Sequence, residues 1–152
     1  MKISFDTNLL IYAIDADAGI RHQEAVELVA QAANVECTLT LQSLGEFFHV
    51  ATRKCGIAPE VARRIVQRWR AVFPTIAANE ADAARAMDAV CDHALPYWDA
   101  LLWATVDRAG CSVLFTEDFQ TGRTLGAVTF VDPFRADNAA IVARALHTSG
   151  PS

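Results

Sequence analysis

Four carboxylates stand out in the sequence because each falls where an apolar segment ends or a helix begins: Asp6, Glu46, Asp99 and Asp118. Acids that are brought close together repel one another, and two unit charges 4 Å apart cost about 4 kcal/mol at an effective dielectric constant of about 20. A cluster of this kind therefore needs a cation, and oxygen ligands favour Mg²⁺ or Mn²⁺. The chemistry that these residues predict is the binding of one or two divalent metal ions.

Each of these acids also has a purely structural explanation. Asp6 could cap the helix that follows it, and Ser43 with Glu46 forms a candidate capping box. Asp99 in a first helical turn suits the helix dipole, and Asp118 could start a turn. Capping would not require all four acids to lie at one edge of a sheet. We therefore favour the interpretation that they share one site.

The elements that must position the acids can be read from the hydrophobic pattern. The expected strands are 2–5, 36–41, 73–76, 111–116 and 128–131. The expected helices are 8–15, 22–33, 43–54, 58–72, 80–94 and 98–109. Strands that alternate with helices indicate a central parallel sheet of about five strands with helices on both faces, which is a three-layer α/β/α fold.

This topology explains why the acids are expected to converge. Sites in open α/β sheets form beyond the carboxyl ends of the strands. Asp6 and Asp118 directly follow the first and fourth expected strands, and Glu46 lies on the helix after the second. Asp99 opens the helix that ends near Gly110 and leads into the fourth strand. Because that helix runs antiparallel to the strand, its amino end lies at the same edge as the other acids.

Length and composition restrict the broad class of protein. The chain has 152 residues, of which 53% are apolar and 20% charged, as expected for one globular domain. The net charge of -5 does not by itself predict nucleic-acid binding. The four cysteines form no C-x-x-C pair, so a zinc site is not predicted. We expect a cytoplasmic protein without a signal peptide or membrane segment, because no apolar stretch approaches the ~20 residues that span a bilayer.

The four acids lie within four short motifs, which are ISFDTN (3–8), LQSLGEF (41–47), YWDALL (97–102) and LFTED (114–118), and a fifth motif, VDPF (131–134), follows them. In their order and spacing these motifs resemble the PIN-domain nucleases, and with the chain length they resemble the VapC-type toxins of toxin–antitoxin modules. The resemblance covers residues 1–134, which we expect to form the PIN domain. Residues 135–152 are expected to be a C-terminal extension to which the sequence assigns no role.

The resemblance implies an activity and a set of residues. The metal-binding and catalytic carboxylates would be Asp6, Glu46, Asp99 and Asp118. The supporting polar residues would be Thr7, Asn8, Thr116 and Glu117. Either Asp118 or its neighbour Glu117 could approach the metal, and the threonine-x-acid spacing favours Asp118 as the principal ligand with Glu117 secondary. The implied protein is a Mg²⁺- or Mn²⁺-dependent endoribonuclease that hydrolyses RNA with a metal-activated water. It would act as the toxin of a type II toxin–antitoxin system, form a homodimer and bind a cognate antitoxin protein.

Basic residues are concentrated in one part of the chain. Six of the 13 bases lie between residues 53 and 70, and they include the candidate RNA-binding residues Arg53, Lys54, Arg63, Arg64 and Arg68. Such a run is either an ordinary solvated helix face or a rim that contacts phosphates. Two bound divalent ions would change the formal charge from -5 to -1 and ease the approach of RNA.

Two other functions compete with the nuclease. The first is a PIN fold that keeps partner contacts but has lost cleavage, which the intact set of four acids argues against. The second is a phosphotransfer domain of the receiver or haloacid-dehalogenase type. The phosphatase pattern requires a second Asp where this chain has Asn8, and a receiver requires a late lysine, whereas the only lysines here are Lys2 and Lys54.

Overall fold

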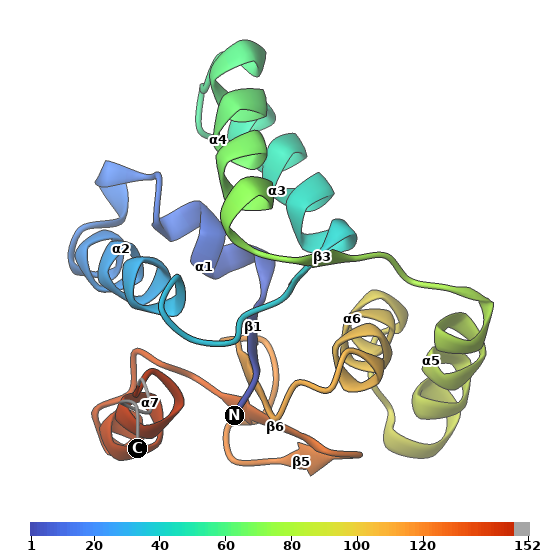
Figure 1. Ribbon diagram of the computed structural model, residues 1–152. Coiled ribbons are helices and arrows are strands. Elements are labelled where there is room, and N and C mark those ends of the chain that lie inside the picture. Colours follow the sequence, from blue (N-terminus) through green and yellow to red (C-terminus); the bar gives the residue numbers. More distant parts are fainter. Residues whose placement is uncertain (148–152) are drawn as a thin grey trace.

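The computed structural model describes residues 1–147, and its elements follow the predicted alternation of strands and helices (Figure 1). The strands are β1 (Ile3–Phe5), β2 (Leu39–Thr40), β3 (Thr75–Ile76), β4 (Val113–Phe115), β5 (Thr124–Leu125) and β6 (Val128–Val131). The helices are α1 (Thr7–Tyr12), α2 (Ile20–Ala32), α3 (Leu41–Arg53), α4 (Pro59–Val72), α5 (Glu80–His93), α6 (Tyr97–Arg108) and α7 (Ala139–Ala145). Short 3₁₀ turns occupy Ala16–Ala18 and Ala136–Asn138.

The sheet differs in detail from the expected five parallel strands. Strands β1, β4 and β6 are parallel neighbours, and β5 adds an antiparallel edge beside β6. Strands β2 and β3 form a separate parallel pair, which a single bridge between Ile3 and Cys37 links to β1. The sequence did not predict β5, because two residues before a tight turn at Gly126 carry no alternating pattern.

Alternating side chains divide the sheet between two helical layers, and the predicted three-layer α/β/α class is confirmed. Val113 and Phe115 of β4 pack into a cluster with α1, α2, α3 and α4. Leu114 between them packs with α5 and α6 on the opposite face. Figure 1 shows α1 and α2 on one side of β1 and the α5–α6 pair on the other.

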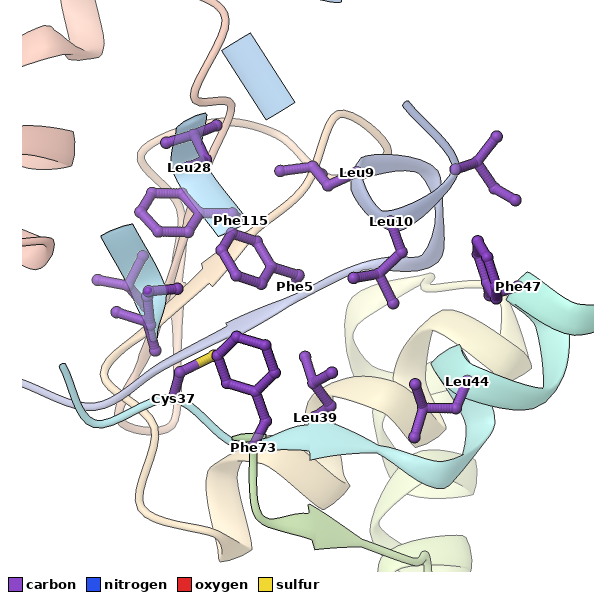
Figure 2. Close-up of a cluster of buried hydrophobic side chains, with 14 of the residues drawn as sticks. Phe5, Leu9, Leu10, Leu28, Cys37, Leu39, Leu44, Phe47, Phe73 and Phe115 are labelled. Carbon is purple, nitrogen blue, oxygen red and sulfur yellow. The ribbon is translucent and has the colours of Figure 1, made fainter. Parts of the chain in front are cut away.

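Aromatic and aliphatic side chains around β1 anchor the first cluster (Figure 2). The rings of Phe5 and Phe115 stack with centroids 5.6 Å apart, and both side chains are fully buried. Leu39 and Phe73 lie on the other side of β1 in the same view. Full burial of a side chain of this size stabilises the fold by about 1.5–3 kcal/mol. The carboxyl end of β1, from which Asp6 projects, is therefore held in place by fully buried side chains of the first core cluster.

Two helix ends matter for the site. Helix α3 begins at Leu41, because the Thr40 side chain caps it by accepting a hydrogen bond from the Ser43 backbone N–H. The capping-box alternative for Ser43 and Glu46 is therefore wrong, and the Glu46 carboxylate is free for other contacts. The second is the carboxyl end of α6, the helix that begins with Asp99 in its first turn. Helix α6 ends at Arg108, and Gly110 follows with a φ of +83°. This left-handed glycine is the predicted end of the helix.

The described part of the expected C-terminal extension packs onto the domain. Ala145 of α7 is buried in the first core cluster, and Ile141, Val142 and Leu146 pack against that cluster. The expected extension also includes residues 148–152, which lie outside the described residues. Within residues 1–147, no helix combines the length and apolar character that crossing a bilayer requires.

Candidate functional site

Asp6 is a buried carboxylate at the carboxyl end of β1. Its side chain is 6% exposed. One carboxylate oxygen accepts a hydrogen bond from the Thr7 backbone N–H at 2.7 Å, and the other accepts one from the Thr116 hydroxyl at 2.8 Å. Asp6 is thus the N-cap of α1, as the structural explanation expected. The Thr116 bond also ties it to the end of β4, so the cap and a shared site coexist.

The electrostatic environment of Asp6 disfavours its charge. Burial raises the pKa of the Asp6 carboxyl to about 7, against the opposing effect of the bonds from Thr116 and Thr7. The charge of Asp118 raises this pKa further. A carboxyl that is costly to ionise in the empty protein is one whose charged form a bound cation would stabilise.

Glu46 reaches the same edge from the second turn of α3. Its carboxylate accepts a hydrogen bond from the Thr7 hydroxyl at 2.8 Å and another from the Gln42 side-chain amide at 3.2 Å. The same Gln42 amide donates to the backbone carbonyl of Trp98 at 3.0 Å, which joins α3 to the start of α6. Sequence reasoning missed Gln42, although a glutamine one helical turn before a site glutamate is a recognisable signal.

Asp99 occupies the first turn of α6 and is half-buried. Burial raises the pKa of its carboxyl, and the charges of Asp118 and Glu46 raise the pKa further. The Asp118 charge therefore acts on both Asp6 and Asp99. These couplings show that the fold brings the four predicted acids into one electrostatic neighbourhood.

Thr116 and Asn8 both form hydrogen bonds with Asp118, the fourth acid. The Thr116 hydroxyl accepts a hydrogen bond from the Asp118 backbone N–H at 3.1 Å while it donates to Asp6. The Asn8 side-chain amide donates to the Asp118 carboxylate at 3.3 Å. Asp118 thus lies beside the start of α1, and its carboxylate is exposed to solvent.

Glu117 has a different partner from its neighbour. Its carboxylate forms an ion pair with the Arg21 guanidinium of α2 at 2.9 Å, and its side chain is only 17% exposed. Thr116, Glu117 and Asp118 thus each contact a different element. In this arrangement Asp118, rather than Glu117, shares the neighbourhood of Asp6 and Asp99.

The oxygen atoms of the four acids are suitable ligands for a hard cation, but they are not already gathered around one metal position. Within residues 1–147, no ion pair joins a lysine, arginine or histidine to Asp6, Glu46, Asp99 or Asp118. All of the available donors are oxygen atoms, which Mg²⁺ and Mn²⁺ prefer. In the same part of the chain, no group of three or more His, Cys, Asp or Glu side chains is already arranged to hold a metal. The acids would have to draw closer around an ion.

The candidate RNA-binding residues lie on α3, α4 and the turn between them. Arg53, Lys54, Arg63, Arg64 and Arg68 are exposed. None of the ion pairs found in residues 1–147 includes any of them. No described contact joins any of these five residues to the four acids, and we refer to the five together as the basic surface.

Comparison with known proteins places the chain among related folds. Residues 3–124 match the sequence pattern of the PIN domain family. The fold is similar to that of the VapC20 toxin of Mycobacterium tuberculosis, which cleaves the sarcin–ricin loop, with a TM-score of 0.64, 21% identity and coverage of 77% of this chain and 90% of that one. No curated protein matches the chain.

Two further structures share the fold and come from complexes. A toxin–antitoxin complex from Klebsiella pneumoniae aligns with a TM-score of 0.62 and 21% identity over 84% of this chain and 96% of that one. VapBC2 from Rickettsia felis, bound to a DNA fragment from its promoter, aligns with a TM-score of 0.59 and 13% identity over 86% and 97%. At these identities the likeness concerns the fold.

Proposed function

Because the chain belongs to the PIN domain family, we propose that it is a divalent-metal-dependent endoribonuclease and the toxin of a toxin–antitoxin pair. The observation that carries the proposal is the environment of Asp6. This buried acid has a raised pKa, lies in the field of Asp118 and has no cationic side chain as a partner within residues 1–147. A fold that buries an unpaired acid among other acids is suited to an external cation.

The proposed roles follow from the contacts. Asp6, Glu46, Asp99 and Asp118 would hold Mg²⁺ or Mn²⁺, with Asp6 and Asp99 as the direct ligands. A bound divalent ion would lower the pKa of an attacking water and offset charge on the phosphate. Thr116 fixes one oxygen of Asp6, and Thr7 and Gln42 orient Glu46. Asn8 orients Asp118. These neighbours hold the acids in place before RNA arrives.

The decisive test is RNA cleavage by purified protein that has been freed of any partner. Wild type should cleave in Mg²⁺ and lose activity in excess EDTA, and Asp6→Asn should reduce cleavage by at least about 100-fold, since it removes a ligand charge. Cleavage that survives both changes would contradict the proposal. A folded protein that cleaves no RNA class would favour the non-catalytic PIN module, and phosphorylation of Asp6 by a small phosphodonor would favour a phosphotransfer domain.

We also propose that the antitoxin docks between α2 and α4. An apolar groove there, of about 390 Å³, is lined by Ile14, Val26, Ile65, Trp69 and Val72 among others. Val26 and Val72 are 45% and 55% exposed, and Arg68 lines the same groove. An amphipathic segment with acidic residues fits such a surface. Coexpression with the neighbouring gene should yield a copurifying small protein, and its consistent absence would count against an antitoxin.

Three finer features belong to the same proposal. The basic surface of Arg53, Lys54, Arg63, Arg64 and Arg68 would contact RNA phosphates away from the acids. The homodimer is supported by the exposed apolar side chains of Leu41, Phe48 and Trp98, which are 50%, 38% and 63% exposed. We expect the protein to act in the cytoplasm, where RNA and a newly made antitoxin are both available.

A further inference from the structure

Arg21 is a basic residue that lies beside the acidic edge. It is in the first turn of α2, and its guanidinium pairs with Glu117 at 2.9 Å. Glu117 stands between two residues of the site, since Thr116 donates to Asp6 and Asp118 accepts from Asn8. The segment of residues 116–118 therefore couples Arg21 directly to the neighbourhood of the four acids.

Aromatic rings hold the Arg21 guanidinium in a defined position. Its central carbon lies 5.8 Å from the centroid of the Tyr12 ring and 5.4 Å from that of Phe134. These two rings contact each other edge to face at 5.6 Å. The Arg21 side chain nevertheless remains 48% exposed. An arginine that is both fixed on aromatic faces and open to solvent presents its N–H groups in the geometry that suits a phosphate.

A polar pocket adjoins Glu117, the ion-pair partner of Arg21. The pocket has a volume of about 610 Å³ and is lined by Glu117, Gln120, Thr121, Arg135 and Asn138 among others. Glu117 belongs both to the pocket wall and to the segment of residues 116–118, so the pocket adjoins the acidic edge.

We propose that Arg21 binds a backbone phosphate of the RNA beside the cleaved bond, and that Glu117 occupies Arg21 until the RNA arrives. This inference rests on the proposed nuclease function. The four acids repel every phosphate except the one at the metal, so a neighbouring phosphate needs its own cation. The arginine of this ion pair is 48% exposed, and a phosphate that offers two acceptor oxygens can compete with the carboxylate for its N–H groups. Glu117 then acts as a stand-in for substrate rather than as a metal ligand.

The test measures RNA binding in a background that does not cleave. In the Asp6→Asn protein, the affinity for a fluorescently labelled single-stranded RNA is measured by anisotropy at several salt concentrations. Arg21→Gln should raise Kd about tenfold and reduce the salt slope by about 0.7, the loss of one phosphate contact. The Kd of Arg21→Lys should lie between that of the Asp6→Asn parent and that of Arg21→Gln, because lysine keeps the charge but lacks the planar guanidinium. Circular dichroism and thermal unfolding check that each variant folds.

Arg144→Gln supplies the matched control. Arg144 is exposed on α7 and lines a surface hollow with Met1, at the opposite end of β1 from Asp6. This variant loses the same charge but should change Kd less than about twofold, because it has no phosphate contact to lose. Equal Kd values for Arg21→Gln and Arg144→Gln would overturn the inference.

Glu117→Gln separates the two roles of the glutamate. If Glu117 only occupies Arg21, this substitution should tighten RNA binding about two- to threefold and leave Mg²⁺-dependent cleavage in place when Asp6 is intact. A loss of cleavage comparable to that of Asp6→Asn would assign Glu117 to the metal and overturn the inference. Failure of the nuclease proposal would look different, since wild type would then cleave no RNA although the binding comparison still gives a result.

Discussion

Two groups of carboxylates in this protein are treated in opposite ways by the fold. Asp82 and Asp107, on α5 and α6, are each paired with an arginine. The second group contains the four site acids, Asp6, Glu46, Asp99 and Asp118. These acids accept hydrogen bonds or lie near one another's charges, but none forms an ion pair within residues 1–147. Helix α6 contains both kinds, with Asp99 in its first turn and Asp107 near its last.

The paired group shows how this protein neutralises acids that serve its structure. Asp82 is 1% exposed, and it accepts hydrogen bonds from the Arg108 guanidinium and from the Asn79 backbone N–H in a capping box. Burial alone would raise the pKa of Asp82, but the bonds from Arg108 and Asn79 outweigh it and hold the pKa below its usual value. Arg85 pairs with Asp107 and also lies over the Trp103 ring at 4.8 Å.

The contrast separates acids that stabilise the fold from acids that are kept for an external partner. Asp82 is paired with Arg108, and its pKa falls. The site acids Asp6 and Asp99 have raised pKa values, because burial and like charges act on them and no ion pair within residues 1–147 includes either acid. Protonation or the binding of a cation removes this free-energy cost.

The largest expected effect is on RNA cleavage, in a comparison of substitutions at the two ends of α6. Asp99→Asn should reduce RNA cleavage by about 100- to 1000-fold and leave thermal stability nearly unchanged or slightly higher, because it removes a ligand and a repulsive charge. Asp107→Asn should leave cleavage within about twofold and lower stability by about 1 kcal/mol, since it breaks the pair with Arg85. Cleavage rates and thermal unfolding are compared side by side. Equal losses of cleavage in both variants would remove the distinction between the two groups.

The second prediction concerns stability and pH in EDTA. Because the folded pKa of Asp6 is about 7 and its usual value is 3.8, its ionisation destabilises the fold as the pH rises between these values. Asp6→Asn should therefore match wild type below pH ~4 and be more stable above pH ~7, by at most about 4 kcal/mol. Urea unfolding at several pH values measures the difference. A difference that stays constant across this range would show that Asp6 is not held against its charge.

The smallest effect on RNA cleavage is expected for a second acid of the paired group, Asp82. Asp82→Ala should lower the free energy of unfolding by about 2 kcal/mol, because it removes both a cap and the partner of Arg108. Since the pKa of Asp82 is lowered on folding, this contribution is present above pH ~4 and fades as the pH falls further. Asp88→Ala, at an exposed position on the same helix, is the control and should change stability by less than about 0.5 kcal/mol. RNA cleavage should be unaffected in both variants.

Local patterns were sufficient to predict most of the elements. The long amphipathic repeat of α4 and the left-handed glycine after α6 matched the expected residues closely. The start of α3 was predicted too late, because Thr40 and Ser43 are both good caps and only the packing of β2 favours Thr40. The sequence did not predict strand β5, which pairs with β6, or helix α7. Neither short element carries a clear hydrophobic period.

The contacts within the site show where prediction from sequence stops. Motif order indicated the four acids and Thr116, because these residues lie at fixed offsets from the ends of strands. The pairing of Arg21 with Glu117, and the bridge that Gln42 makes from Glu46 to Trp98, join segments that are distant in the chain. No local pattern identifies such partners, which depend on how α2, α3 and α6 pack.

The sequence by itself determined which residues could bind a cation and at which edge of the sheet they would lie, because strand order and hydrophobic alternation fix where each strand ends. Only the tertiary structure decided which acids are left without a positive partner. Electrostatic energy depends on distance and burial, and both arise when separate elements pack. Asp82 and Asp6 are both capping aspartates in the chain. Within residues 1–147, packing provides an arginine for the first, whereas the second has the Thr116 hydroxyl and the nearby charge of Asp118 but no positive partner.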